Sequence, residues 1–291
     1  MDDNVLLAFA FTLLAGLSTG IGSALAFFAD RTNTRFLAGS LGFSAGVMIY
    51  VSFVELLAGA TKDLVAAMGS ESTGQWAAAG SFFLGMAFIA IIDKLVPEVE
   101  NPHEVKKVEE MHPTGDSQNL FAAAREREGR GDAGLKRPGE TRHLMRMGTM
   151  TALVIGIHNF PEGLATFIST LEDASIGLSI AIAIAIHNIP EGIAVSVPIF
   201  YATGDRRKAF TWSFLSGLTE PLGALVGYLI LRPFMTPAVS GMVLAAVAGI
   251  MVFISLDELL PSAEKYGEHH LSIYGAVAGM MVMAASLLLL T

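Results

Sequence analysis

Cysteine is absent from the 291 residues of the chain, and charged residues make up only 15% of them. Without thiolates, disulfides and cysteine-ligated zinc sites are excluded, so any metal site must use nitrogen and oxygen donors. A soluble domain carries about a quarter charged residues. Apolar residues instead form 53% of the chain, in runs of about 20 residues, the length that crosses a bilayer core. The composition therefore predicts an all-α polytopic membrane protein.

The apolar runs predict a single transmembrane domain over residues 1–291. The N-terminal Asp2 and Asp3 replace the basic start of a cleaved signal peptide, so we expect the first run to be retained. A polar connection at 61–74 separates the second and third runs, and the polar segment 97–141 predicts a mobile loop. Eight helices are expected, at about 5–29, 36–60, 75–96, 142–171, 175–201, 209–231, 237–261 and 271–290.

Lysine and arginine are distributed unevenly between the two sets of predicted loops. Of the 18 basic residues, 16 fall on one side, and only Lys62 and Arg232 fall on the other. Basic residues concentrate in cytoplasmic loops. The asymmetry predicts a protein of the cell (inner) membrane with segment 97–141 in the cytoplasm and both termini outside.

Two stretches in predicted helices 2 and 7 resemble each other. Residues 45–57 and 248–260 are identical at seven of thirteen positions, and the two helices run in opposite directions. A weaker match joins residues 14–17 with 215–218 in helices 1 and 6. Together these matches predict a 3+2+3 inverted-repeat arrangement, which is typical of transporters with a site near the bilayer midplane.

The same hexapeptide, His-Asn-x-Pro-Glu-Gly, occurs at 158–163 and at 187–192. Its histidine and glutamate are four residues apart, so both lie on one face of a helix. Its proline removes the hydrogen-bond partner of the carbonyl four residues earlier. We expect the two copies to converge, and Glu220 of helix 6 to join them. The candidate metal ligands are therefore His158, Asn159, Glu162, His187, Asn188, Glu191 and Glu220.

Three glutamates at this depth have no lysine or arginine beside them in the sequence. A buried carboxylate is costly unless it is paired, which leaves a cation or protons as the partner. Imidazole suits zinc, iron and nickel, and carboxylate and amide oxygens suit harder ions such as manganese. The donor set predicts a divalent transition metal with loose discrimination, and bridging glutamates would suit two ions.

The doubled hexapeptide, its place on consecutive helices, the long loop after helix 3 and Thr219-Glu220 resemble the ZIP (Zrt/Irt-like) family, most closely its bacterial zinc-transporter branch. The resemblance covers almost the whole chain. It implies eight helices, a binuclear centre between helices 4 and 5, and uptake of divalent metal, chiefly zinc and also iron, manganese or cadmium, into the cytoplasm.

The resemblance also implies how the ligands divide. One metal would take His158, Glu162 and Glu191 with His187 close by, and the second Asn159, Glu162, Asn188, Glu191 and Glu220. Asn188 stands where some relatives carry aspartate, which removes a negative charge from the second site. Met48 matches a methionine near the centre in some relatives.

Other polar residues suggest a path for the ion, with solvated helix ends as the equally open alternative. The path candidates are Glu55 on the outer side and Asp93, Asp257 and Glu258 on the inner side; His269 and His270 are candidate cytoplasmic metal ligands. The competing function is an intramembrane metal-dependent enzyme, but its usual His-Glu-x-x-His pattern is absent. The expected partners are metal ions and the lipid bilayer, not nucleic acid, with a homodimer implied by the resemblance. No catalytic residue or resident cofactor is expected.

Overall fold

The computed structural model describes residues 4–26, 34–95, 138–203, 205–266 and 269–290, and every regular element in these ranges is a helix. The α-helices are α1 (Val5–Ala26), α2 (Thr34–Val51), α3 (Ala58–Met68), α4 (Glu71–Leu95), α6 (Pro138–Glu172), α7 (Ala174–Thr203), α8 (Arg206–Gly217), α9 (Thr219–Leu231), α10 (Pro237–Ile254), α11 (Leu260–Tyr266) and α12 (His269–Leu290). A 3₁₀ turn, η4 (Arg232–Phe234), and two π-helical turns join some of them.

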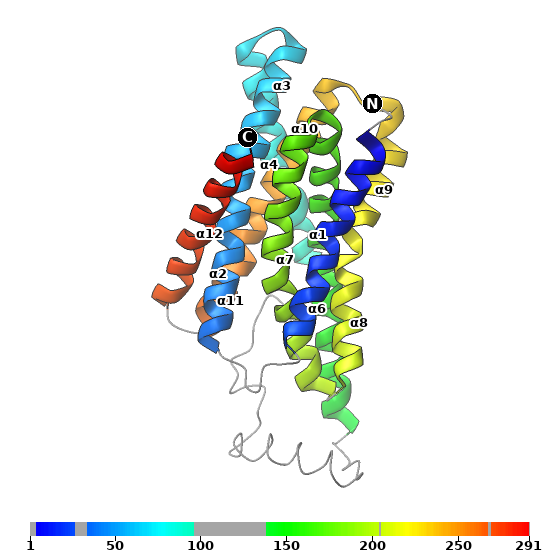
Figure 1. Cartoon of the computed structure of the whole chain (residues 1–291), viewed down its shortest axis with the longest axis vertical. Coiled ribbons are helices and arrows are strands. Elements are labelled where there is room, and N and C mark those ends of the chain that lie inside the picture. Colours follow the sequence, from blue (N-terminus) through cyan, green and yellow to red (C-terminus); the bar gives the residue numbers. More distant parts are fainter. Residues whose placement is uncertain (1–3, 27–33, 96–137, 204, 267–268, 291) are drawn as a thin grey trace.

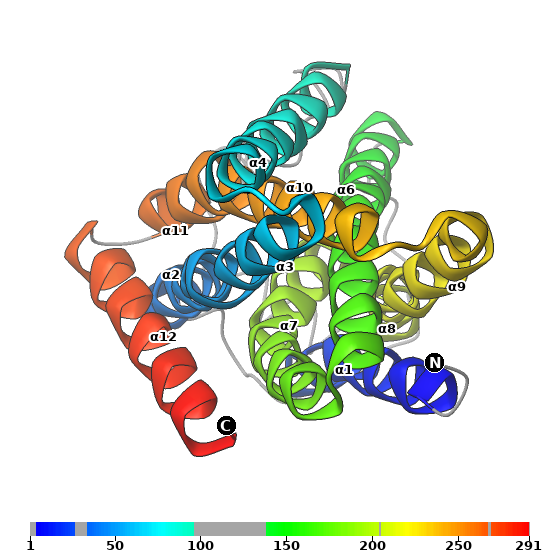
Figure 2. The same ribbon diagram turned by 90° about the horizontal axis from the view of Figure 1, so that it is seen from above.

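Seven segments in the described part of the chain are long and apolar enough to cross a membrane. The first of them, α1, has 22 residues and is therefore about 33 Å long, which matches a bilayer core. The remaining long helix, α6, lies among them near the centre of the bundle (Figure 2). The described beginning of α1 and end of α12 lie at the same end of the bundle, as expected for an even number of crossings (Figure 1). The chain is a multi-pass membrane protein.

The helices pack as two groups (Figure 2). The first, which we call the site group, contains α1, α6, α7, α8 and α9. The second, the flanking group, contains α2, α3, α4, α10, α11 and α12. Packing within each group is extensive, whereas the two groups meet mainly where α2 contacts α7 and where α6 contacts α10.

Two π-helical turns interrupt the flanking group at matching places. The turn η2 (Ser52–Leu57) follows α2, and η5 (Ser255–Leu259) follows α10. Ser52 and Ser255 are aligned in the sequence match described above. A π-turn inserts an extra residue into a helix and is rare enough that it often marks a functional site. Each turn carries one of the matched glutamates, Glu55 or Glu258.

The last residue of each hexapeptide is glycine because a neighbouring backbone lies directly against it. A Cβ at Gly163 of α6 would overlap the carbonyl oxygen of Glu220 in α9. A Cβ at Gly192 of α7 would overlap the carbonyl oxygen of Thr19 in α1. Small residues allow such close approach of helices in membranes. The glycines thus draw α6 and α7 against α9 and α1.

The helices differ from the sequence expectation in two places. The expected connection at 61–74 is mostly helical, because α3 continues to Met68 and α4 begins at Glu71. The expected single helix over 209–231 is divided at Leu218 into α8 and α9, which places Glu220 in the first turn of α9. Of the expected loop 97–141, residues 97–137 lie outside the described part, and α6 begins at Pro138.

The close contact at Gly192 predicts a loss of stability on adding one methyl group. Gly192→Ala should destabilise the fold by about 1–3 kcal/mol, because overpacking forces α7 away from α1. Gly80→Ala is the matched control, since a Cβ there meets nothing within 4 Å. Thermal unfolding in detergent measures both variants. Equal midpoints for the two would contradict the packing described here.

Candidate metal centre

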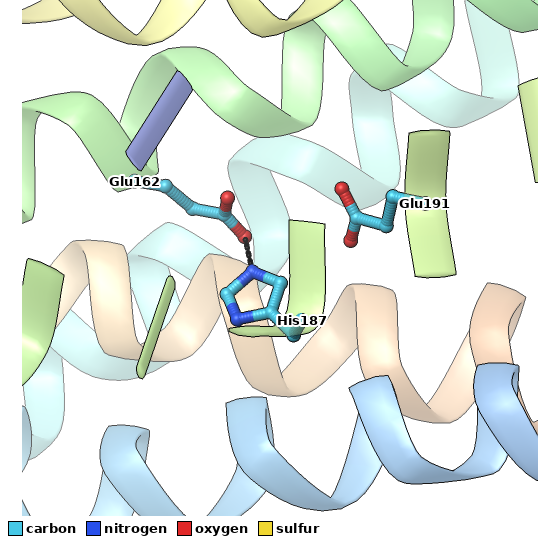
Figure 3. Close-up of side chains that lie close together, drawn as sticks. All are labelled: Glu162, His187 and Glu191. Carbon is cyan, nitrogen blue, oxygen red and sulfur yellow. Dashed lines mark ion pairs between the residues drawn. The ribbon is translucent and has the colours of Figure 1, made fainter. Parts of the chain in front are cut away.

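Three ionisable side chains of the hexapeptides meet between α6 and α7. Ligand atoms of Glu162, His187 and Glu191 all lie within 4.8 Å of one another, and the three side chains point toward a common centre (Figure 3). Nε2 of His187 is 3.3 Å from Oε1 of Glu162. All three residues are buried, with at most 2% of their surface exposed. The four-residue spacing in each hexapeptide, on two packed helices, produces this cluster.

The cluster contains more acceptors than the described protein satisfies. Both carboxylate oxygens of Glu162 and both of Glu191 have no hydrogen-bond partner among the described residues, and neither does either ring nitrogen of His187. No lysine or arginine is buried among the described side chains. Buried polar groups normally have partners, and buried carboxylates require a counter-charge. The cluster therefore fits a bound cation with nitrogen and oxygen ligands.

The two hexapeptide asparagines lie beside the cluster and use their amide hydrogens on backbone carbonyls. Nδ2 of Asn159 donates to the carbonyl of Ser216 at 3.2 Å. Nδ2 of Asn188 donates to the carbonyl of Ala15 at 3.0 Å. In both residues Oδ1 is buried and has no partner among the described groups. Since the donors are occupied by backbone, the oxygens are left as potential metal ligands.

Glu220 joins the second hexapeptide through Asn188, whose Nδ2 also donates to Oε1 of Glu220. The other oxygen, Oε2, has no partner among the described groups, and the residue is fully buried. The division of the expected helix at Leu218 places this glutamate at the start of α9. Glu220 and the two asparagine oxygens thus offer a harder, oxygen-only set beside the cluster.

His158, the remaining hexapeptide ligand candidate, contacts a residue of the flanking group. Its Nε2 lies against Oε2 of Glu258, which belongs to η5, and both side chains are buried. From the sequence, Glu258 was expected only on the inner part of the ion path. The sequence match aligns Glu258 with Glu55, but both residues belong to the flanking group. The match therefore does not predict that Glu258 contacts His158 of the site group.

The other path candidates differ in how far they are buried. Met48 is fully buried in the apolar core, Glu55 and Asp93 are partly exposed, and Asp257 is exposed. His269 and His270 are exposed at the start of α12, where Nδ1 of His269 is 2.7 Å from Oε1 of Glu264. Of the two adjacent acids on η5, Glu258 is thus the buried one, and it contacts His158.

A multi-pass helical protein with buried carboxylates and imidazoles at its centre defines a class: membrane proteins with an internal cation site. The profile of the family described as ZIP Zinc transporter matches residues 78–287. The chain belongs to this family, whose members are transporters and not enzymes.

Close relatives share almost the whole chain. It is 61% identical over 287 residues to the zinc transporter ZupT of Clostridium perfringens, covering 99% of this chain and 97% of the relative. It is 60% identical over 292 residues to ZupT of Nitratidesulfovibrio vulgaris, covering 99% and 98%. It is 58% identical over 290 residues to ZupT of Lysinibacillus sphaericus, covering all of both chains. The family resemblance seen in the sequence is confirmed.

Unpaired acceptors at the cluster predict that a metal stabilises the fold. Zn²⁺ at a hundredfold excess over its dissociation constant should stabilise the protein by about 2.7 kcal/mol. Glu162→Gln/Glu191→Gln should lose this gain while its metal-free form stays at least as stable, because neutral amides replace buried charges. Thermal unfolding with and without zinc measures both effects. The control variant Asp63→Asn/Glu71→Gln removes two carboxylates outside the cluster and should keep the stabilisation by zinc. If Glu162→Gln/Glu191→Gln were still stabilised by zinc, the cluster would not be the metal site.

Proposed function

We propose that this protein transports divalent metal ions, chiefly Zn²⁺, across the membrane into the cytoplasm. The observation that carries the proposal is the buried cluster of Glu162, His187 and Glu191. Its carboxylate oxygens have no hydrogen-bond partner, and no lysine or arginine is buried, among the described residues. Its relatives are named as zinc transporters. Iron, manganese and cadmium suit the same mixed nitrogen and oxygen donors.

The cluster and the oxygen set beside it together would hold the ion or ions in transit. Glu162 and Glu191 would bridge, with imidazole nitrogens on one side and the oxygens of Asn159, Asn188 and Glu220 on the other. Bridging carboxylates hold two ions about 3.5–4 Å apart. Asn188 contributes a neutral oxygen, so we expect the oxygen-rich position to bind metal more weakly than a position with aspartate there would.

A two-fold inverted repeat relates the first three helices of the chain to the last three, and α6 to α7. Supporting contacts occur in matched pairs. Asn159 donates to the carbonyl of Ser216, and Asn188 to that of Ala15. A Cβ on Gly22 of α1 would overlap the carbonyl of Ile189 in α7. At the corresponding position of α9, a Cβ on Gly223 would overlap the carbonyl of Phe160 in α6.

The flanking group repeats in the same way. A Cβ on Gly46 of α2 would overlap the carbonyl of Ala276 in α12, and a Cβ on Gly249 of α10 that of Phe82 in α4. Both groups thus obey one symmetry, which supports the 3+2+3 arrangement. A carrier built this way exchanges access by moving one body past the other around a fixed site.

The contact between the two groups suits such a movement. It is confined mainly to α2 with α7 and α6 with α10. A cavity of about 480 Å³ opens beside the second of these contacts, with Phe88 and Ile250 of the flanking group facing Phe160, Pro161 and Trp212 of the site group. An apolar gap at a group boundary leaves few interlocking side chains to resist sliding. The distribution of lysine and arginine supports a cytoplasmic position for segment 97–141 and an outer position for both termini.

Transport through the cluster predicts that its carboxylates are indispensable. Glu162→Ala/Glu191→Ala should reduce zinc uptake into proteoliposomes to the level of empty vesicles, because no side chain replaces the two anionic ligands. Asp63→Asn/Glu71→Gln should transport at the wild-type rate. Uptake by the alanine variant above that of empty vesicles would refute this route through the bundle.

The two neighbouring acids of η5 should differ in importance. Glu258→Gln should lower the uptake rate about tenfold, since removing a carboxylate from a metal-binding histidine weakens metal sites by this order. Asp257→Asn should stay within about twofold of wild type, because Asp257 is exposed and exposed charges contribute little. Initial rates at zinc concentrations well below half-saturation decide between them. Equal losses in both variants would show that general negative charge on this turn, rather than contact with His158, matters.

A further inference from the structure

The contact between His158 and Glu258 lacks its counterpart in the structure. The inverted repeat pairs His158 with His187 and Glu258 with Glu55. His158 and Glu258 are in contact. His187 lies instead 3.3 Å from Glu162, and Glu55 is partly exposed. The contacts of the hexapeptide asparagines and glycines occur in both halves of the repeat. The contact of His158 with Glu258 occurs in one half only.

The two histidines and the two glutamates belong to different bodies. His158 and His187 are on α6 and α7 of the site group. Glu258 and Glu55 are on η5 and η2 of the flanking group. One displacement of the flanking group along the site group therefore carries both glutamates together. A displacement that withdraws Glu258 from His158 brings Glu55 toward His187 by the same symmetry.

We propose that Glu55 is a positioning residue for His187 in the opposite access state. In the structure described here Glu258 contacts His158; in the other state Glu55 contacts His187, and Glu258 is released. The inference rests on the proposed transport function and on its inverted repeat. It assigns Glu55 to the metal centre in one of the two states, in place of a role limited to collecting ions outside.

The chemistry of the contact explains why a glutamate is placed at both positions. A carboxylate held against one nitrogen of an imidazole orients the ring and raises the basicity of its other nitrogen toward a metal. Each histidine would thus be held as a strong ligand in one state and loosened in the other. The π-turns are the local devices that present the glutamates, since a π-turn rotates the following side chains relative to an α-helix.

The absence of native cysteine makes the exchange measurable with introduced thiols. Two double variants, His158→Cys/Glu258→Cys and His187→Cys/Glu55→Cys, are treated in native membranes with dibromobimane, which fluoresces when it bridges two nearby thiols. We expect both pairs to fluoresce, because a carrier visits both states. The crossed variant His158→Cys/Glu55→Cys should not, since neither state brings these positions together. A linked first pair with an unlinked second pair overturns the proposal.

Uptake kinetics of Glu55 variants provide a second test of the proposal, which is the deciding one if dibromobimane bridges neither thiol pair. Glu55→Gln should raise the half-saturation concentration for zinc uptake by on the order of tenfold, the usual effect of losing the carboxylate behind a metal-binding histidine. Glu55→Asp should recover part of this loss, and Asp63→Asn should behave as wild type. An unchanged half-saturation in Glu55→Gln overturns the proposal. Failure of the wild-type protein to transport zinc would instead overturn the proposed function, so the two failures are distinguishable.

Discussion

The structure depends on one electrostatic constraint: carboxylates are held in the interior of a membrane bundle without a buried lysine or arginine among the described side chains. Glu162, Glu191 and Glu220 are all buried. Dehydrating a carboxylate costs several kcal/mol even after the protein relaxes. The amide groups of Asn159 and Asn188 bond backbone carbonyls, and Asn188 also bonds Glu220, but these neutral groups cannot balance the charge of the carboxylates. A bound cation or proton must therefore balance the charge of the carboxylates. Because the transported ion itself provides this balance, the site is suited to binding and releasing it.

Glycine contacts make this burial possible. Close approach of α1 to α7 and of α9 to α6 at Gly192 and Gly163 excludes water from the centre. It also brings the backbone carbonyls of Ala15 and Ser216 within reach of the asparagine amides. The hexapeptide is thus one unit: histidine, asparagine and glutamate carry the chemistry, and glycine sets the distance at which the neighbouring helix supports them.

Much of this centre follows from spacing in the sequence, and the remainder depends on contacts between distant segments. The four-residue interval predicted that His187 and Glu191 lie on one face of a helix, and the structure joins both with Glu162 in one cluster. The contact of His158 with Glu258 joins residues 100 positions apart. It also depends on the π-turn η5, which the local sequence pattern does not predict. Residues 61–68 were expected to be a connection because Thr61, Lys62 and Asp63 are polar, yet they continue a helix that extends the apolar α2.

The proposed inverted repeat has one exception that bears on mechanism. Asn159 and Asn188 bond equivalent carbonyls, but Asn188 also bonds Glu220, and the residue of α1 that corresponds to Glu220 is Thr19. Two states related by a perfect repeat would be equally stable, so binding and release would be equivalent on the two sides of the membrane. In the proposed carrier, a single extra carboxylate on the α9 side would make the two states differ in their affinity for a cation. The exchange of glutamate for threonine across the proposed repeat is therefore the feature by which the proposed carrier binds a cation more tightly in one access state than in the other.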